Sequence, residues 1–459
     1  MQNDESSWIS IDRAPGETLR AALRRTLRNA VRDGALRAGT RLPASRVLAR
    51  QLGVSRGVVT DAYAQLEAEG FLVVRERLAP VVAGVAAQPR RRSAADSPPR
   101  APRYDLTPTT PDVMGFPLRQ WLAAYQKSAR RTAPATLDYR EPRGELALRE
   151  VLADHLGRTR GVIAEPGQII VVQGTAQGFD LLLRSLAARG ARRVAVEDPS
   201  HTTQHERIRA HGIDLVAQPV DRHGVTVDGL DADALLVTPA HQFPTGCVLT
   251  GARRRALLAW ADADDALFVE DDYDSEFRYD REPVRALQGL APERVVYLGT
   301  VSKTLAPALR LGWVVAPFDT VADLERAKRL ADDFSPVLDQ LALAALIADG
   351  EYDRHLRRAR RSYRARRDAL VTALGEQLPE LVVDGIAAGV HVLLRLPGGV
   401  SDAVVADEAA CAGIRVPPLS AFRITPSNAG GLVIGYGRLH ESAVGAATRA
   451  LATVIRRHI

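Results

Sequence analysis

The sequence predicts a two-part protein, with a small winged helix-turn-helix at residues 1–84 and a large α/β domain at residues 104–459. Three observations lead to this fold class. Three short amphipathic segments followed by two short apolar runs occupy the beginning of the chain. A stretch rich in Pro, Ala, Ser and Arg follows at residues 85–103 and has no core periodicity. Beyond it, continuous apolar runs alternate with amphipathic segments, which is typical of a buried, mostly parallel sheet.

The first predicted helix covers residues 17–33 and ends at Gly34. Its apolar side chains recur every four residues and form one stripe: Leu19, Leu23, Leu27 and Val31. This spacing indicates a helix that buries one face.

Two further helices and a hairpin complete the small domain. We expect the second helix to have Pro43 in its first turn and to bury Val47, Leu48 and Leu52. Gly53 ends it. The third helix has Ser55 as its predicted N-cap, with an apolar side formed by Val58, Ala62 and Leu66. The short apolar runs of FLVVRERLAPVVAG then predict a hairpin.

The charge of the chain is concentrated near its N-terminus. The formal net charge is +6, and residues 1–84 hold 13 arginines against 9 acidic residues. Residues 90–103 add RRR and two more arginines, whereas the rest of the chain is close to balanced. This asymmetry favours contact with a polyanion at one end, although a generally arginine-rich composition would give a similar excess.

The large domain contains five runs that predict strands buried on both faces, at residues 168–174, 192–198, 233–239, 266–272 and 294–300. Near Pro317 the pattern changes to long helices and a shorter sheet at 391–396 and 431–437. We expect a smaller α+β subdomain at about 318–459.

Several classes of protein are disfavoured. No apolar run approaches the roughly 18 residues of a membrane span, and the N-terminus lacks the pattern of a secretory signal. Cys247 and Cys411 are predicted to be packing residues without a disulfide, which favours a cytoplasmic location. The chain has no CxxC motif, and its single HxxxH spacing, His201 and His205, does not suggest a metal, so none is expected.

Residues 41–71, RLPASRVLARQLGVSRGVVTDAYAQLEAEGF, resemble the GntR family of winged-helix regulators. The resemblance implies that Arg46, at the start of the second helix, and Ser55 and Arg56, at the start of the third, bind a double-stranded DNA operator. A helix N-terminus favours phosphate, and arginine can bind phosphate or guanine in a bidentate manner. The wing sequence RERLAPVVAG lacks the family's glycine-rich tip, which leaves contacts from the wing in doubt.

The most informative segment of the large domain is YLGTVSKTLAPALRLGW, residues 297–313. Lys303 follows a buried strand, and burial or a nearby positive charge keeps a lysine amine neutral enough for Schiff-base chemistry. Ser302 and Arg310 can both hold a phosphate. Pro307 interrupts a regular helix, so the segment can fold back around a ligand. Upstream, FVEDDYDSEF places carboxylates and Tyr273 at the end of another buried strand, which is where ligands bind in open α/β sheets.

These motifs resemble fold type I aminotransferases, and the EDDYDSEF and SKTLAPALRLG pair resembles the MocR/GabR regulators in particular. The resemblance covers about residues 104–459 and implies pyridoxal 5'-phosphate (PLP) as the cofactor. It implies that Lys303 forms the imine, Asp271 pairs with the pyridine nitrogen and Tyr273 binds the ring hydroxyl. Arg310 and Ser302 would hold the phosphate.

The same resemblance extends to other motifs. Gly174, Thr175 and Ala176 match the loop that holds the phosphate at a helix N-terminus. Tyr139 matches a tyrosine that reaches the phosphate of the other subunit, which implies a homodimer. TPAHQFPTG, residues 238–246, matches the turn beneath the cofactor.

The chain departs from its relatives at the effector site. His201 occupies the place of an aromatic residue that stacks on the cofactor ring, and Thr203 stands where GABA-responsive members have an arginine. Val433 and Ile434 occupy the region of the arginine that binds the substrate carboxylate in aminotransferases. Arg423 or Arg438 could replace it.

The loss of this carboxylate clamp predicts a domain that senses and does not turn over substrate. The effector is expected to be PLP itself or an amine, such as a sulfonate-bearing one. An aminotransferase with an N-terminal extension is the alternative, and a nucleoid protein is disfavoured because it leaves the large domain unexplained.

Overall fold

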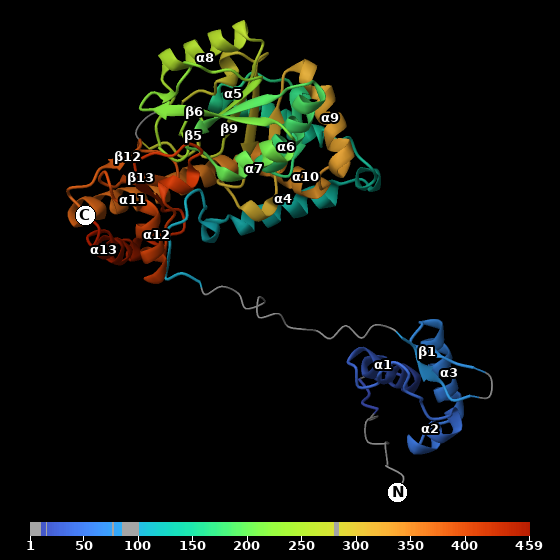
Figure 1. The fold of residues 1–459 in the computed structure, drawn as a ribbon. Helices are drawn as coiled ribbons and strands as arrows, with labels where there is room; N and C mark the ends of the chain where they lie inside the picture. Colours follow the sequence, from blue (N-terminus) through green and yellow to red (C-terminus); the bar gives the residue numbers. More distant parts are fainter. Residues whose placement is uncertain (1–10, 15, 76–77, 85–100, 280–283) are drawn as a thin grey trace. The chain divides into compact units, whose positions relative to one another are not determined.

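The computed structural model describes residues 11–14, 16–75, 78–84, 101–279 and 284–459. The chain separates into two compact units, residues 1–100 and 101–459, and each is described by itself (Figure 1). Most of the predicted linker, residues 85–100, lies outside the described residues.

The N-terminal unit consists of three helices and a two-stranded hairpin. These are α1 (Leu19–Arg32), α2 (Ser45–Gln51), α3 (Arg56–Ala68), β1 (Leu72–Val73) and β2 (Val81–Val82). Leu23, Leu27 and Val31 of α1 are buried, as the four-residue spacing predicts. They pack against α2 and α3 in one core, so the winged helix-turn-helix predicted from the sequence is present.

Three details of this unit differ from the expectation. Pro43 precedes α2 and is not in its first turn, and Val47 is 41% exposed, so its predicted burial is wrong. Helix α2 has only seven residues, and Leu48 and Ala49 already fill its contact with the core. In α3 the core position belongs to Val59, which lies three residues before Ala62, while Val58 is half-buried.

The wing is short. Strands β1 and β2 pair antiparallel, with Leu72 opposite Val82. The segment 75–84, in which the sequence lacks a glycine-rich tip, includes residues 76–77, which lie outside the described part.

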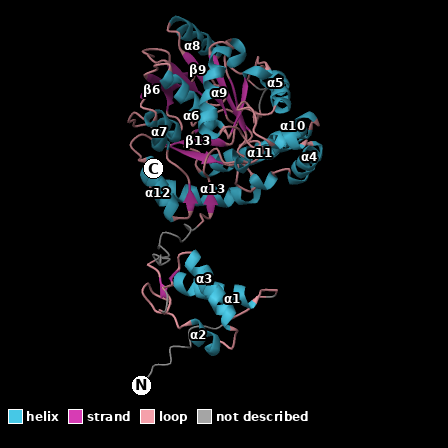
Figure 2. Cartoon of the chain, turned by 90° about the vertical axis from the view of Figure 1, so that its right-hand side faces the viewer, coloured by secondary structure: helices cyan, strands magenta, loops and turns pink. Residues whose placement is uncertain are grey.

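A mixed eight-stranded sheet forms the centre of the large unit, and helices cover it on both sides (Figure 2). In spatial order its strands are β4 (Ile169–Val172), β11 (Gly312–Val315), β10 (Val295–Thr300), β9 (Leu267–Asp272), β8 (Ala234–Val237), β5 (Arg193–Asp198), β6 (Asp214–Asp221) and β7 (Gly224–Val225). The run from β10 to β6 is parallel, whereas β11 is antiparallel to both neighbours. All five predicted strands are present.

The continuous hydrophobicity of these strands reflects burial on both faces. In β4, Ile169 and Val171 pack in the core on one side, and Ile170 and Val172 pack in the core on the other. One side is covered by α4 (Leu118–Arg131), α5 (Leu146–Arg160), α8 (Gly251–Ala263) and α10 (Val337–Ala348). The opposite side is covered by α6 (Thr175–Ala188), α7 (Thr202–Ala210) and α9 (Phe318–Asp332).

The C-terminal part forms a smaller subdomain around an antiparallel three-stranded sheet. Its elements are β12 (Val383–Asp384), β13 (His391–Arg395), β15 (Gly431–Gly435), β14 (Ile414–Arg415), α11 (Glu351–Gln377), α12 (Asp402–Cys411) and α13 (Val444–Ile455). The start of the large unit also belongs here, because β3 (Tyr104–Asp105) pairs in parallel with β14. Leu106 is buried in the same core.

The helices α9 and α10, which fall in the predicted range 318–459, have their buried side chains in the cores around the large sheet. The apolar faces of α9 and α10 pack in the same way as those of the other helices that cover the large sheet. The change from strand-like to helical patterns along the sequence does not reveal which sheet a helix covers. Cys247 and Cys411 are free thiols. Among the described residues, no helix has the length and hydrophobicity of a membrane span.

Candidate functional site

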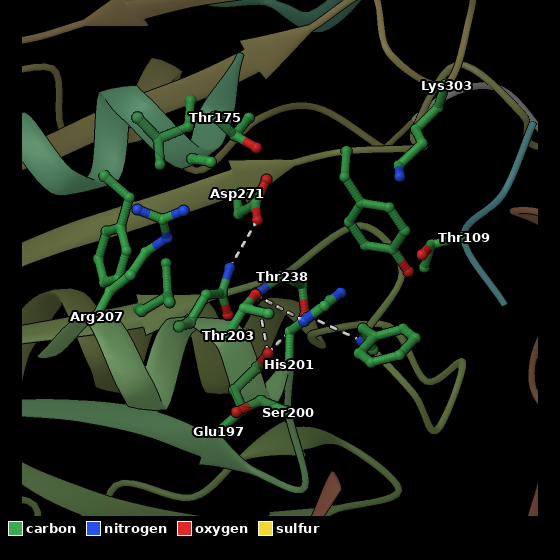
Figure 3. A pocket seen from close by; sticks show the side chains of 17 residues that line it. Thr109, Thr175, Glu197, Ser200, His201, Thr203, Arg207, Thr238, Asp271 and Lys303 are labelled. Atoms are coloured by element: carbon green, nitrogen blue, oxygen red, sulfur yellow. Dashed lines mark hydrogen bonds between the residues drawn. The ribbon is translucent and has the colours of Figure 1, made fainter. Parts of the chain in front are cut away.

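A cavity of about 210 Å³ lies where several parallel strands end and α6 begins (Figure 3). Asp271 comes from the end of β9, Glu197 from the end of β5, Thr238 directly follows β8, and Lys303 follows β10. In a parallel sheet these carboxyl ends share one edge, which is the usual ligand site of the architecture. The topology thus brings together residues from widely separated parts of the chain.

Lys303 directs its amino group into this cavity (Figure 3). The segment after β10 turns at Pro307–Leu309 and returns as β11, which pairs antiparallel with β10. Burial lowers the pKa of the Lys303 amine, while the carboxylates of Asp271 and Asp274 act in the opposite direction. A buried amine with a lowered pKa is a better nucleophile toward a carbonyl carbon near neutral pH.

Asp271 is the acidic residue of its motif that faces the cavity. Its Oδ2 accepts a hydrogen bond from Gln204 Nε2 at 2.9 Å, whereas Oδ1 is buried and has no hydrogen-bond partner among the described residues. Burial raises the pKa of Asp271 to about 7, although the nearby Lys303 lowers it.

The two neighbours of Asp271 are used elsewhere. Glu270 accepts hydrogen bonds from the backbone N–H groups of Leu287 and Gln288 at 3.0 and 2.9 Å. Asp272 forms a buried ion pair with Arg160 at 2.7 Å and accepts a hydrogen bond from the Tyr297 hydroxyl at 2.6 Å. The choice of Asp271 from sequence is therefore consistent with the geometry.

One end of the cavity meets the N-terminus of α6. Gly174 is its N-cap with φ of +85°, a conformation that favours glycine, and Thr175 and Ala176 line the cavity. The first N–H groups of a helix have no partner within it and attract anions. The Arg310 guanidinium lies against Gly174 and donates to the Gln173 carbonyl. Ser302 is buried, and its hydroxyl accepts a hydrogen bond from Thr300 Oγ1 at 2.9 Å.

His201 lines the cavity and stacks on Phe243, with ring centroids 5.3 Å apart and planes 30° apart. Its Nδ1 lies 3.1 Å from Thr203 Oγ1. Burial, with a contribution from the positive charge of Lys303, lowers the pKa of His201 to about 4, so the ring is neutral at pH 7. A neutral imidazole can pack against an aromatic ring.

Tyr273 lines the opposite part of the cavity. Its hydroxyl donates to the His241 carbonyl at 3.1 Å and lies 3.3 Å from His241 Nδ1. Burial raises the pKa of this phenol well above its usual value, so it remains a hydrogen-bond donor.

Several predicted residues lie outside the cavity of this chain. Tyr139 is 86% exposed, with its ring edge-on to Phe334 at 6.1 Å. Val433 is fully buried in an apolar cluster with Phe243 and Tyr273, so no charge stands at the place of a carboxylate clamp. Arg438 forms an exposed ion pair with Asp105 at 3.2 Å.

The structure adds lining residues that the sequence reasoning did not single out. Gln204, one turn after His201 in sequence, supports Asp271, and Phe243 lies within the predicted turn 238–246. Thr109 has φ of +58°, which is uncommon for a β-branched residue and is found at functional sites. A glutamine three residues after His201 carries no periodic signal, so only the fold could reveal it.

The residues predicted to read DNA are all exposed on the N-terminal unit. Arg56 is the first residue of α3 and Ser55 is its N-cap, with no side-chain capping hydrogen bond. Arg46 lies at the start of α2. The first turn of α3 therefore presents an uncapped N-terminus and a cation on the same surface.

Comparison with known proteins separates the two units in the same way. Residues 18–82 match the model "Bacterial regulatory proteins, gntR family", and residues 109–430 match "Aminotransferase class I and II". The solved structure of a multiple substrate aminotransferase from Thermococcus profundus is similar at 26% identity with a TM-score of 0.71, covering 77% of this chain and 91% of that chain. The large unit thus has the fold of a PLP-dependent family.

Two relatives match across both units. The HTH-type pyridoxine biosynthesis transcriptional regulator PdxR of Corynebacterium glutamicum is 36% identical, over 90% of this chain and 91% of its own length. The probable rhizopine catabolism regulatory protein MocR of Rhizobium meliloti is 32% identical, over 93% of this chain and 92% of its own length. Fold and sequence define a helix-turn-helix regulator with an aminotransferase-like domain. The chain belongs to the MocR-type regulators of the gntR family.

The raised pKa of Asp271 gives a testable pH dependence. Its folded pKa is about 7, above the unfolded value of about 4, so its contribution to the free energy of unfolding is lost as pH rises toward 7. We expect the cofactor-free wild type to lose up to about 1.4 kcal/mol per pH unit more than Asp271→Asn between pH 5 and 7. Denaturant unfolding of both proteins across this range would measure it, and parallel curves would contradict the assignment.

Proposed function

We propose that this chain is a DNA-binding transcriptional regulator whose aminotransferase-like unit binds PLP through Lys303 and senses PLP itself or an amine. The observation that carries the proposal is the pairing, in one cavity, of a buried lysine with a buried carboxylate oxygen that has no partner. This arrangement is costly without a ligand and is satisfied by a protonated pyridine nitrogen.

The residues around the cavity fit PLP from end to end. Asp271 would hold the ring nitrogen and Tyr273 the ring hydroxyl. The N-terminus of α6, together with Arg310 and Ser302, would hold the phosphate. His201 and Phe243 supply flat surfaces for the ring. When bound, PLP supplies an aldehyde that reacts with amines and a ring that accepts electrons.

The protonation states of Lys303, Asp271 and His201 set the charge of this site. The Lys303 amine is neutral more readily than an exposed lysine because burial disfavours its charged form. Asp271 would share a proton with the nitrogen of a bound ring and so keep that ring electron-poor. His201 stays neutral and therefore adds no positive charge over the ring.

Weak turnover is expected because the apolar Val433 stands where related aminotransferases have an arginine. Fast transamination needs the substrate carboxylate held in one orientation, and an apolar side chain cannot form that bidentate contact. Arg207 lines the cavity and is available for an anionic effector, whereas Arg423 is half-buried, has no hydrogen-bond partner for its Nε among the described residues and does not line the cavity. Sensing is therefore favoured over catalysis.

The surface at the start of α3 is the proposed operator contact. Arg56 would contact base edges or phosphate in the major groove, Ser55 would donate a hydrogen bond to a phosphate at the helix N-terminus, and Arg46 would bind the backbone. We also propose a homodimer, supported by the 86% exposure of Tyr139, which is then free to reach the cofactor phosphate of the partner subunit.

PLP itself is the favoured effector, since the Corynebacterium glutamicum relative is named a pyridoxine biosynthesis regulator. Full-length protein should be freed of cofactor and titrated onto DNA from the intergenic region beside its own gene. We expect addition of PLP alone to change operator affinity by about 5- to 150-fold, the usual range of allosteric coupling.

The alternative effector is tested by adding amines to the PLP-loaded protein and measuring operator affinity in the same way. A sulfonate-bearing amine that shifts both the cofactor absorbance and the operator affinity would replace PLP as the effector. If neither PLP nor any amine alters DNA binding while the protein still takes up PLP, the sensing role is wrong.

A further inference from the structure

Three buried side chains that could ligate a metal meet behind the cofactor cavity. His241 lies in the turn after β8, Asp274 lies two residues after β9, and His391 begins β13 of the smaller subdomain. Each is no more than 3% exposed. They do not line the cavity itself, but Tyr273 and Phe243 contact them from that side.

The hydrogen bonds of this cluster are incomplete. His241 Nδ1 lies 2.9 Å from Asp274 Oδ2, and because a carboxylate only accepts, Nδ1 is the donor. His241 Nε2 and both ring nitrogens of His391 are buried with no hydrogen-bond partner among the described residues. The Pro244 carbonyl is near His391 but does not meet hydrogen-bond geometry.

This pattern is unusual for a packing core. A neutral imidazole has one donor and one acceptor, and leaving both without a hydrogen bond in a buried site is costly. Two histidines stand side by side here, with ring centroids 4.8 Å apart.

The backbone is arranged to let these groups approach. Gly389 has φ of +68°, and a Cβ built on it would lie 2.2 Å from His241 Cε1 and 2.5 Å from Asp274 Oδ2. No other residue type could occupy this position without moving the pair. The glycine therefore maintains the close packing of the cluster.

We propose that His241, Asp274 and His391 bind a divalent transition-metal ion of the zinc class. One ring nitrogen from each histidine and one carboxylate oxygen form a three-ligand set, with a fourth position for water or the Tyr273 oxygen. The ligand atoms lie within 4.8 Å of one another. Ligand atoms that lie about 2.1 Å from a tetrahedral ion are about 3.4 Å apart, so the most distant pair must close by up to about 1.4 Å on binding.

The donor set selects the class of metal. Imidazole nitrogen suits Zn²⁺, Ni²⁺, Cu²⁺ and Co²⁺, whereas Mg²⁺ and Ca²⁺ require oxygen ligands. Binding through His241 Nδ1 would displace the proton shared with Asp274 and release it to solvent, whereas binding through the unpartnered Nε2 would leave that hydrogen bond in place. Because the Tyr273 hydroxyl lies 3.3 Å from His241 Nδ1, the ion would also polarise the phenol that faces the cavity.

The site does not depend on the cofactor, so it can be tested on its own. Full-length protein should be stripped with a chelator, dialysed against ZnCl₂ and analysed for bound metal, with CoCl₂ as a spectroscopic probe. We expect one equivalent of Zn²⁺ per chain and an intense visible Co²⁺ spectrum of a four-coordinate site. His391→Phe and His241→Phe should each weaken binding by at least about 10- to 100-fold.

Two further variants sharpen the test. His391→Cys keeps a metal-ligating group and should restore Co²⁺ binding with a thiolate charge-transfer band. His211→Asn is the matched control, because His211 Nε2 pairs with Asp180 at 2.8 Å without a second histidine nearby, and it should bind as the wild type does. Absence of stoichiometric binding by the wild type, or unchanged binding by both phenylalanine variants, would overturn the proposal.

Discussion

Lys303→Ala is expected to eliminate the covalent attachment of PLP and leave a colourless protein. The chain contains three lysines, Lys127, Lys303 and Lys328. Only Lys303 lines the cavity, since Lys127 pairs with Asp349 at the surface and Lys328 with Asp332. No other lysine amine can take its place.

Borohydride reduction followed by peptide mass analysis would measure this effect. In the wild type, the mass of reduced PLP should appear on the peptide that contains Lys303. Lys127→Ala, which removes an exposed lysine of the same unit, should label as the wild type does. Labelling of Lys127 or Lys328 in the wild type would show that the cavity has been assigned incorrectly.

Arg56→Ala should weaken operator binding by about 1–3 kcal/mol, or roughly 5- to 150-fold, if the arginine reads a base edge in the major groove. Arg56 is exposed at the N-terminus of α3, and its loss should not disturb the core, which contains Val59 and Leu66. Gel-shift titration and absorbance of the bound cofactor, measured on the same preparation, would separate DNA binding from PLP binding.

A suitable control is Arg20→Ala, which removes the same charge from an exposed arginine that pairs with Asp61 at 2.9 Å. It should change affinity much less than Arg56→Ala. If Arg56 contacts only phosphate, affinity should fall equally on operator and unrelated DNA, and the salt dependence should decrease by about one unit. Equal affinity of Arg56→Ala and wild type would contradict the orientation of α3.

Much of the fold could be predicted because its signals are local. Strands buried on both faces appear as continuous apolar runs such as Ile169–Val172, and α1 appears as a four-residue stripe. The exposure of Val47 could not be predicted, because a seven-residue helix needs few core positions and hydrophobicity alone does not show which of its sides faces the core.

Only the part of the site that lies in short sequence motifs could be predicted. Lys303, Asp271 and Tyr273 lie in two compact segments whose spacing is informative. Gln204 and the His241, Asp274 and His391 cluster are assembled from distant segments, so no spacing rule finds them. The 86% exposure of Tyr139 likewise follows from no local pattern in the sequence.

The pairing of β3 with β14 determines which part of the large unit is joined to the helix-turn-helix. Leu106 donates its backbone N–H to the Arg415 carbonyl at 2.8 Å, and its carbonyl accepts from Gly435 at 2.8 Å. The polypeptide that arrives from the N-terminal unit is thus fastened to the smaller subdomain and not to the eight-stranded sheet. A ligand that tilts this subdomain would therefore move β3 with it, and the eight-stranded sheet would not need to change.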